Sequence, residues 1–245
     1  MPPSETILIT GASGGIGAAV ARAFAAPSRR LALAAHRSVA HATEVAQAVR
    51  EAGAGVRVFE ADLSTAAGCA ALADAVTAWA GTPLTGIVHA AGGTRDRLAA
   101  TLGEADWDQV MEVNLSAAWR LVRRIPLAKR GFIILIGSSA GVVGRVGQAP
   151  YAAAKAGIEA LATTLAAELS DMEIRINSVL PGPVDTPMWR QLGAAAQARV
   201  LKDNGLSEVR RPEEVARFIL ALSGRHHGSG RTVPINGWVD GALSG

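Results

Sequence analysis

Two residues with complementary acid–base chemistry lie four positions apart in an alanine-rich segment. Tyr151 is the only tyrosine of the 245 residues, and Lys155 is one of three lysines. The run 149–167 favours a helix, on which residues i and i+4 share a face. An ammonium beside a phenol favours phenolate and lowers the pKa of the tyrosine from about 10 toward neutral. Such a tyrosine can exchange a proton with a carbonyl or alcohol oxygen, whereas the structural interpretation is a half-buried ring packed on a lysine stem.

The composition excludes several classes of protein. Hydrophobic residues make up 49% and charged residues 18% of the chain, enough for the core of one α/β domain or two small ones. The net charge of +3 argues against a nucleic-acid-binding protein. Cys69 has no partner for an internal disulfide and suits a reducing compartment. We find no signal peptide, membrane span or metal-ligand motif, so we expect a cytoplasmic protein without a metal.

A glycine-rich turn follows the first predicted strand. Residues 6–10 form a short apolar run, and 18–26 have a helical pattern. Strand, glycine-rich turn and helix is the context of a dinucleotide-binding site, where backbone N–H groups at the helix start hold a pyrophosphate. The alternative is a tight turn without a ligand. The predicted cofactor residues of this turn are Gly11, Ser13, Gly14, Gly15, Ile16 and Gly17.

The end of the second predicted strand bears on the choice of cofactor. Residues 31–35 form this strand, which runs into His36, Arg37 and Ser38. In a doubly wound fold this position faces the adenosine ribose, where an acidic residue would bind a 2′-hydroxyl and an arginine suits a 2′-phosphate. Arg37 and Ser38 therefore predict NADP rather than NAD. An exposed arginine at a strand end would leave the preference open.

Strands and helices alternate along the rest of the chain. Further strands are predicted at 56–60, 86–93, 131–136, 174–179 and 232–235, and further helices at 40–52, 65–80, 106–124, 150–169 and 212–222. Such alternation predicts one parallel sheet with helices on both faces. We find no repeat and no linker. We therefore expect a single Rossmann-type, doubly wound α/β domain over 1–245, with about seven parallel strands and a variable substrate lid at 186–210.

Taken together, these motifs resemble the short-chain dehydrogenase/reductase family over essentially the whole chain. The resemblance implies a catalytic tetrad of Asn114, Ser138, Tyr151 and Lys155, with the gap from serine to tyrosine favouring Ser138 over Ser139. It also implies cofactor contacts from Asp62 and Leu63, from Ala90, Ala91 and Gly92, from Tyr151 and Lys155, and from Pro181, Gly182, Val184 and Thr186.

Within the family, the segments 136–138, 147–157 and 175–179 are most similar to the β-ketoacyl-(acyl-carrier-protein) reductases. The resemblance implies NADPH-dependent reduction of a 3-oxoacyl thioester. This chain departs from the pattern in three places. Gly14 stands where many NADP-using members have a basic residue, and the segment from Asn114 to Ser138 is about one helical turn shorter. His89 replaces an asparagine, and we expect it to be a neutral, hydrogen-bonded residue rather than a proton carrier.

The tetrad residues have distinct expected roles. Tyr151 protonates the developing alkoxide, and Ser138 donates a hydrogen bond to the same oxygen. Lys155 lowers the pKa of Tyr151 and holds the nicotinamide ribose, while Asn114 holds a water that supplies protons through Lys155. The structural alternatives are a helix asparagine facing solvent for Asn114 and a turn serine for Ser138.

Substrate and partners are less constrained by the sequence. Met188, Trp189 and Leu192 of the lid can line an apolar pocket or pack on the domain. A cluster of basic side chains can attract an acidic acyl carrier protein through complementary charge. The alternative is that these basic side chains form a solvated face or ion pairs at a subunit interface. The cluster comprises Arg120, Arg123, Arg124, Lys129 and Arg130. The resemblance implies a homotetramer or dimer. Two further functions stay open: an NAD-dependent alcohol or sugar dehydrogenase, and a non-catalytic dinucleotide sensor.

Overall fold

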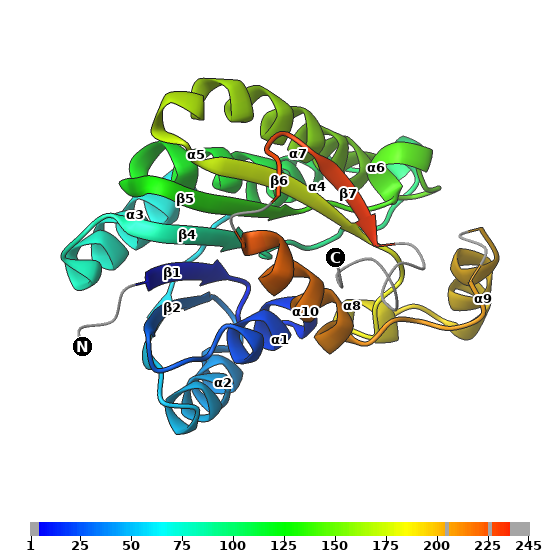
Figure 1. Ribbon diagram of the computed structural model, residues 1–245. Helices are drawn as coiled ribbons and strands as arrows, with labels where there is room; N and C mark the ends of the chain where they lie inside the picture. The colour runs from blue at the N-terminus through cyan, green and yellow to red at the C-terminus, as the bar shows by residue number, and fades with distance from the viewer. Residues whose placement is uncertain (1–4, 204–205, 225–226, 236–245) are drawn as a thin grey trace.

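The computed structural model describes residues 5–203, 206–224 and 227–235, so lid residues 204–205 and the ends of the predicted domain lie outside the described residues. Seven strands alternate with helices, as predicted (Figure 1). The strands are β1 (Glu5–Thr10), β2 (Arg29–Ala35), β3 (Gly55–Glu60), β4 (Leu84–His89), β5 (Leu127–Ile136), β6 (Arg175–Pro181) and β7 (Thr232–Ile235).

All seven strands belong to one parallel sheet with the order β3-β2-β1-β4-β5-β6-β7. The chain moves outward from β1 to β3 and then returns to the other side of β1 to form β4. The loops after β1 and β4 therefore diverge to opposite faces and leave a crevice at the carboxyl edge, where open α/β sheets bind ligands. The prediction of a doubly wound α/β fold is confirmed.

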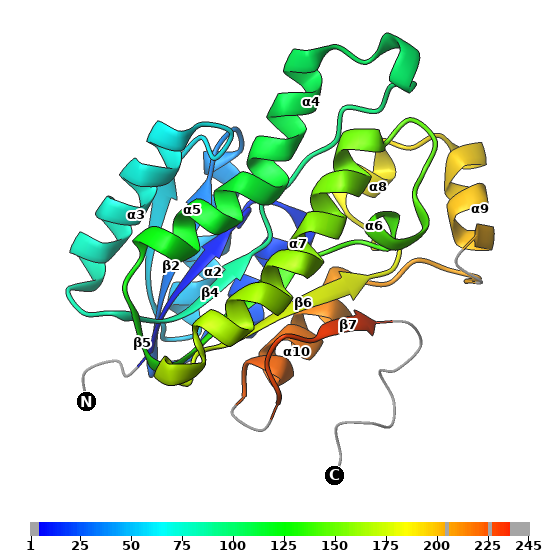
Figure 2. The same ribbon diagram turned by 90° about the horizontal axis from the view of Figure 1, so that it is seen from above.

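The helices form two layers, one on each face of the sheet (Figures 1 and 2). One layer holds α1 (Gly15–Ala23), α2 (Val39–Glu51) and α10 (Pro212–Ser223), and the other holds α3 (Ala66–Ala80), α4 (Glu104–Met111), α5 (Ala117–Arg124) and α7 (Ala149–Glu168). Successive strand side chains point to opposite faces. Ile9 of β1 accordingly packs in the core under the first layer, and its neighbour Leu8 in the core under the second.

The predicted helix 106–124 is interrupted by a π-helical segment. Between α4 and α5 the chain forms η2 (Glu112–Ser116), which contains Asn114. Such widened turns occur mostly at functional sites. α5 then ends at Arg124, because Pro126 disfavours helical geometry in the residue before it.

Several short elements were not predicted. They are η1 (Ala99–Thr101), α6 (Ala140–Val143), η3 (Ser170–Met172), α8 (Pro187–Arg190) and α9 (Ala194–Asp203). α8 and α9 lie beyond the carboxyl end of β6, within the predicted lid (Figure 2). No helix among the described residues is long and apolar enough to cross a membrane. Nor does the described part of the chain bring three His, Cys, Asp or Glu side chains together as a metal site.

Candidate active site

The turn between β1 and α1 forms one wall of the crevice. Gly11 has a φ of +65°, and a Cβ atom there would lie 2.8 Å from the backbone of Ala90 and Ala91. Glycine thus lets the turn approach the end of β4, where the Ala91 N–H donates to Thr10 Oγ1 at 3.1 Å. The first N–H groups of α1 have no intrahelical partner, and residues 15–17 line a cavity. This arrangement fits a pyrophosphate.

Two adjoining cavities of about 360 and 650 Å³ occupy the crevice. Both touch Gly11, Gly14, Ala90 and Gly92, so they are two parts of one groove. Every predicted cofactor residue lines one part or the other. The smaller is lined by Gly11, Ser13, Gly14, Arg37, Ser38, Asp62, Leu63, Ala90, Ala91 and Gly92, and the larger by Gly15, Ile16, Gly17, Tyr151, Lys155, Pro181, Gly182, Val184 and Thr186.

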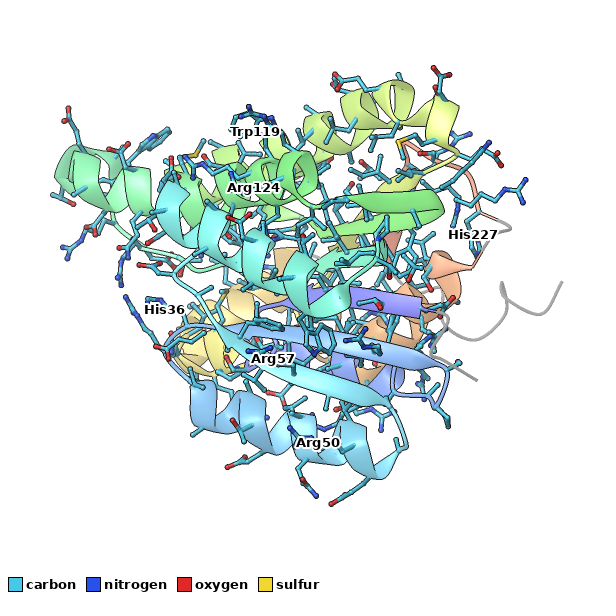
Figure 3. The ribbon with its side chains drawn as sticks, turned by 90° about the vertical axis from the view of Figure 1, so that its left-hand side faces the viewer. His36, Arg50, Arg57, Trp119, Arg124 and His227 are labelled. Carbon is cyan, nitrogen blue, oxygen red and sulfur yellow. The ribbon has the colours of Figure 1, made fainter. Side chains whose placement is uncertain are left out.

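The smaller cavity has a basic end at the carboxyl terminus of β2. His36, labelled in Figure 3, lies there with Arg37 and Ser38. The carboxylate facing them is Asp62, which accepts hydrogen bonds from the Ser64 backbone at 2.9 Å and the Ser64 hydroxyl at 2.7 Å. These bonds lower the pKa of Asp62 and keep it ionised. Arg37 thus lines the end of the groove where the adenosine ribose lies in a doubly wound fold.

The larger cavity brings the four predicted catalytic residues together. Asn114 comes from η2, Ser138 follows β5, and Tyr151 and Lys155 lie on α7, yet all four line the same space. Ser138 Oγ accepts the Ala140 N–H at 3.2 Å, which leaves its O–H free to donate.

The Tyr151 phenol is a weaker acid than the sequence suggests. Burial raises its pKa, and hydrogen bonding with the Ser138 side chain and the charge of Arg145 oppose that rise only in part. The expectation that Lys155 lowers the pKa of Tyr151 is therefore not met. The i, i+4 spacing places the Lys155 Nζ 5.5 Å from the centre of the Tyr151 ring, above its face.

Lys155 is itself perturbed by burial. Its side chain is 4% exposed, and its Nζ donates to the Ile136 carbonyl oxygen at 2.8 Å. Loss of water lowers its pKa to about 8 because the protein interior disfavours the ammonium. A lysine with this pKa can give and accept a proton near neutral pH, which gives Lys155 a proton-transfer chemistry of its own.

Asn114 presents an unsatisfied oxygen to the same space. Its Nδ2 donates to the carbonyl oxygens of Gly93 and Val110, both at 2.8 Å. Its Oδ1 is buried without a hydrogen-bond partner. A Cβ atom on Gly92 would lie 2.5 Å from this oxygen and 3.6 Å from Lys155 Nζ. Glycine thus keeps open a small polar space between Asn114 and Lys155, which fits one ordered water.

His89 is buried between the Thr10 side chain and the π-helical segment. Its Nδ1 lies 3.0 Å from Thr10 Oγ1, while its Nε2 is buried without a well-aligned partner. Burial, and then the charge of Lys155, lowers the pKa of His89 to about 3. The expectation of a neutral histidine is met, although only one ring nitrogen is hydrogen-bonded. A group with this pKa carries no proton between substrate and solvent at neutral pH.

The segment after β6 forms the roof of the larger cavity. Val184 bridges to Arg210, and the Thr186 side chain caps α8 by accepting the Trp189 N–H at 3.2 Å. Met188, Trp189 and Leu192 all line the cavity, as the first of the two sequence-based alternatives predicted. The lid thus presents an apolar surface to the catalytic residues.

The basic cluster predicted to dock a carrier protein lies at the far edge of the sheet. α5 runs antiparallel to the strands, so the last residues of this helix, Arg123 and Arg124, lie near the amino ends of the strands. Lys129 and Arg130 lie at the same end of the sheet, because they are at the start of β5. Ser138 follows the opposite end of β5, about 20 Å beyond Phe132 at roughly 3.3 Å per residue. Figure 3 shows Trp119 and Arg124 on the outer face of the layer that contains α5.

Most of these basic side chains already have acidic partners. Arg124 pairs with Asp74 at 2.7 Å, Arg120 pairs with Glu112, and Lys129 and Arg130 share Glu173 at 3.1 and 2.8 Å. Arg123 instead lies over the Trp119 ring, 5.4 Å from its centre. These ion pairs lie within one protomer and are not the subunit-interface pairs of the sequence-based alternative. Together with the position of the cluster, they argue against a docking site that serves the crevice of the same protomer.

Sequence reasoning missed several charged side chains of the cavity, of which Arg145 is one. Arg145 lines it beside Ser138 and Tyr151, together with Gln148 and the segment 94–97. The available signal was position: Arg145 lies between Ser138 and Tyr151, and a loop joining two catalytic residues must pass close to the site.

Known proteins share both the sequence and the fold. Residues 5–197 match the family model described as short chain dehydrogenase. The chain is 35% identical over 239 residues to 3-oxoacyl-[acyl-carrier-protein] reductase FabG of Pseudomonas aeruginosa, covering 95% of this chain and 96% of that protein. It is 32% identical to acetoacetyl-CoA reductase of Allochromatium vinosum, covering 94% and 96%.

Among solved structures, the chain superposes on a short chain dehydrogenase from Burkholderia cenocepacia in complex with NADP, with a TM-score of 0.89. The two sequences are 27% identical, and the superposition covers 97% of this chain and 98% of that one. The glycine-rich turn, the parallel sheet and the residues gathered in the crevice agree with these matches. The chain therefore belongs to the short-chain dehydrogenase family.

Proposed function

We propose that this protein uses NADPH to reduce the ketone of a 3-oxoacyl thioester to a 3-hydroxyacyl thioester. The observation that carries the proposal is the larger cavity, in which Ser138, Tyr151 and Lys155 share one space with the glycine-rich turn. The names of the Pseudomonas and Allochromatium relatives, both of which denote reductases of 3-oxoacyl thioesters, support this substrate class.

The residues of the crevice fit a dinucleotide. The close approach at Gly11 and the first turn of α1 suit the pyrophosphate, and Arg37 with Ser38 suits a 2′-phosphate. When bound, the reduced nicotinamide supplies the hydride for the carbonyl carbon and is left oxidised.

The protein's own contribution is a proton and a polarised oxygen. The Tyr151 phenol gives its proton to the carbonyl oxygen, and its raised pKa keeps it protonated at neutral pH. The Ser138 hydroxyl donates to the same oxygen and stabilises the negative charge as it develops. One hydride and one proton are thereby added across the C=O bond, which gives the alcohol.

Lys155 and Asn114 return a proton to Tyr151. With a pKa of about 8, Lys155 exchanges protons readily at neutral pH, and one of its three N–H groups is fixed by Ile136. A water held by the unsatisfied Asn114 Oδ1 connects it to solvent. In this proposal the remaining Lys155 N–H groups hold the nicotinamide ribose.

The substrate class is tested by measuring NADPH oxidation with acetoacetyl and longer 3-oxoacyl thioesters, simple ketones and, in reverse, alcohols and sugars. We expect the highest kcat/KM with a 3-oxoacyl thioester. Higher turnover of a sugar or alcohol with NAD would favour the dehydrogenase alternative. Binding of NADPH without turnover of any compound would favour the sensor.

Arg37→Gln is expected to raise the KM for NADPH about 10- to 100-fold and to leave the KM for NADH nearly unchanged. The reason is the loss of a charge-assisted hydrogen bond to the 2′-phosphate, worth roughly 1.5–3 kcal/mol. Arg57→Gln, a substitution on β3 outside both cavity linings, is the matched control. Equal changes for NADPH and NADH in Arg37→Gln would contradict the assignment.

A carrier-bound substrate belongs to the proposal, but delivery from the basic cluster to the crevice of the same protomer is not favoured. Arg123→Glu reverses the charge of a cluster residue that stacks on Trp119. We expect the KM for an acyl-carrier-bound substrate and that for a small thioester to change by the same factor, because any disturbance of α5 affects the reduction of both substrates alike. A selective rise in the KM for the carrier-bound substrate would instead place the docking site at α5.

We further propose a homo-oligomer, a tetramer or a dimer, built through α4, α5 and α7. Trp119 of α5 is 43% exposed, and large aromatic side chains are enriched in protein interfaces. Sedimentation velocity of the wild-type protein and of Trp119→Ala tests this assignment. A monomeric wild-type protein at micromolar concentration would rule it out.

A further inference from the structure

The loop between β5 and α7 holds Arg145 in a fixed position over the catalytic residues. Gly144 and Gly147 flank it with φ values of +69° and +82°. The Arg145 carbonyl oxygen accepts the Gln148 N–H at 3.0 Å, and the Gly147 carbonyl oxygen accepts the Arg97 N–H at 2.9 Å. Two left-handed glycines and these backbone bonds define a tight turn whose tip, Arg145, lines the larger cavity.

Arg145 differs from the other arginines at the mouth of this cavity. Arg95 and Arg97 share the Asp106 carboxylate at 3.7 and 3.4 Å. Asp96 accepts a hydrogen bond from the Gln148 side chain at 2.9 Å. Within residues 5–203, 206–224 and 227–235, no ion pair or hydrogen bond engages the Arg145 guanidinium, although the residue is half-buried.

We propose that Arg145 binds an anionic group of the substrate, a carboxylate or a phosphate, while the carbonyl lies at Ser138 and Tyr151. This inference rests on the proposed reductase function and narrows its substrates to carbonyl compounds that carry a negative charge. A planar guanidinium binds both anions through paired hydrogen bonds.

The electrostatics of the cavity agree with this role. The charge of Arg145 reaches the Tyr151 phenol, whose pKa it lowers against the larger effect of burial. An anion on Arg145 therefore lies within electrostatic range of the reacting oxygen. This proximity favours a carboxylate on the acyl portion over a phosphate at the far end of a pantetheine arm, and the experiment below includes both.

The test compares wild-type protein, Arg145→Gln and the control Arg57→Gln with three substrates at pH 7. Acetoacetate carries a carboxylate beside the ketone, acetoacetyl-CoA carries distant phosphates, and acetoacetyl-N-acetylcysteamine is neutral. For Arg145→Gln we expect kcat/KM to fall about 10- to 100-fold with at least one anionic substrate and less than about threefold with the neutral one. The anion that is affected identifies the ligand.

The control removes the same charge from β3, outside both cavity linings, so Arg57→Gln is expected to change all three values less than about threefold. Loss of the Arg145 charge also raises the pKa of the Tyr151 phenol, and a weaker acid would slow the reduction of all three substrates alike. Only a fall that is selective for an anionic substrate therefore supports the anion site. An equal fall with all three substrates for Arg145→Gln, or no fall with any, would overturn the inference.

A binding measurement separates this inference from the proposed function. Calorimetric titration of wild-type protein and Arg145→Gln with 3-hydroxybutyrate and with CoA needs no turnover. The anion site is supported if Arg145→Gln binds one of the two anions at least tenfold more weakly than wild type, and if added salt lowers the affinity of the wild-type protein for that anion. This result would support the site even if no ketone is reduced. Equal affinities of the two proteins for both anions rule it out, whatever the reductase assay shows.

Discussion

Replacement of Tyr151 by phenylalanine is expected to lower kcat for carbonyl reduction by about 10²- to 10⁴-fold, the usual contribution of a general acid. The substitution removes a single oxygen from a side chain that lines the larger cavity with Ser138. The ring itself remains, with Lys155 Nζ still above its face. The loss should therefore appear in kcat, measured by NADPH oxidation, and the dissociation constant of NADPH should change little.

Two measurements make that result specific. Fluorescence titration with NADPH verifies that the cofactor site of Tyr151→Phe is intact, and circular dichroism verifies the fold. Because Tyr151 is the only tyrosine of the chain, the variant has no other phenol to substitute for it. Retention of more than about a tenth of the wild-type kcat would show that Tyr151 is not the proton donor.

Ser138→Ala is expected to lower kcat by about 10²- to 10³-fold, the effect of removing one donor to a developing oxyanion. Ser138 Oγ already accepts the Ala140 N–H at 3.2 Å, so its own proton is available for the substrate oxygen. The measurement is steady-state NADPH oxidation at saturating thioester.

The neighbouring serine provides a matched control. Ser139 has the same side chain but stands at the start of α6, outside the lining of the larger cavity. Ser139→Ala should keep kcat within about threefold of wild type, as most substitutions away from the site do. If both variants lost activity equally, the effect would come from the loop and not from a hydrogen bond to substrate.

The opposite pKa shifts of Tyr151 and Lys155 suggest that the two residues have different roles in proton transfer. Burial raises the pKa of the phenol and lowers that of the ammonium to about 8, so the two groups titrate in the opposite order from that of a phenolate–ammonium pair. A protonated phenol is the form that reduction requires. A lysine that loses its proton near pH 8 is suited to passing protons on from solvent.

Local patterns in the sequence were enough to predict the elements of the fold. Each of the seven strands was predicted from a short apolar run, and the observed bounds differ by a few residues at most. Side-chain periodicity and turn residues act over a few positions, so they can be recognised without the partner strand. The small residues at 90–92 were likewise recognised as a place where a ligand can approach, because that requirement is also local.

Contacts between distant segments decided the rest. The pKa of Tyr151 could not be predicted from its spacing to Lys155, because it depends on burial under segments that meet only in the folded chain. Three other features could not be predicted for the same reason. They are the hydrogen bond from Lys155 to the Ile136 carbonyl oxygen, the π-helical turn at Asn114 and the distance of the basic cluster from the crevice. Arg145 was overlooked for this reason too. Its sequence neighbours are glycines and valines, and its lack of an ionic partner is a property of the three-dimensional cavity.

The sequence by itself thus determined the sheet, which follows from residue type and local spacing. The resemblance of its motifs to a known family implied the four candidate catalytic residues. The tertiary structure alone decided the burial that shifts the pKa values of Tyr151 and Lys155, and it brought Arg145 to the lining of the larger cavity. Charge state depends on how much water surrounds a group and on which opposite charges lie near it, and both are set by segments far apart in the chain.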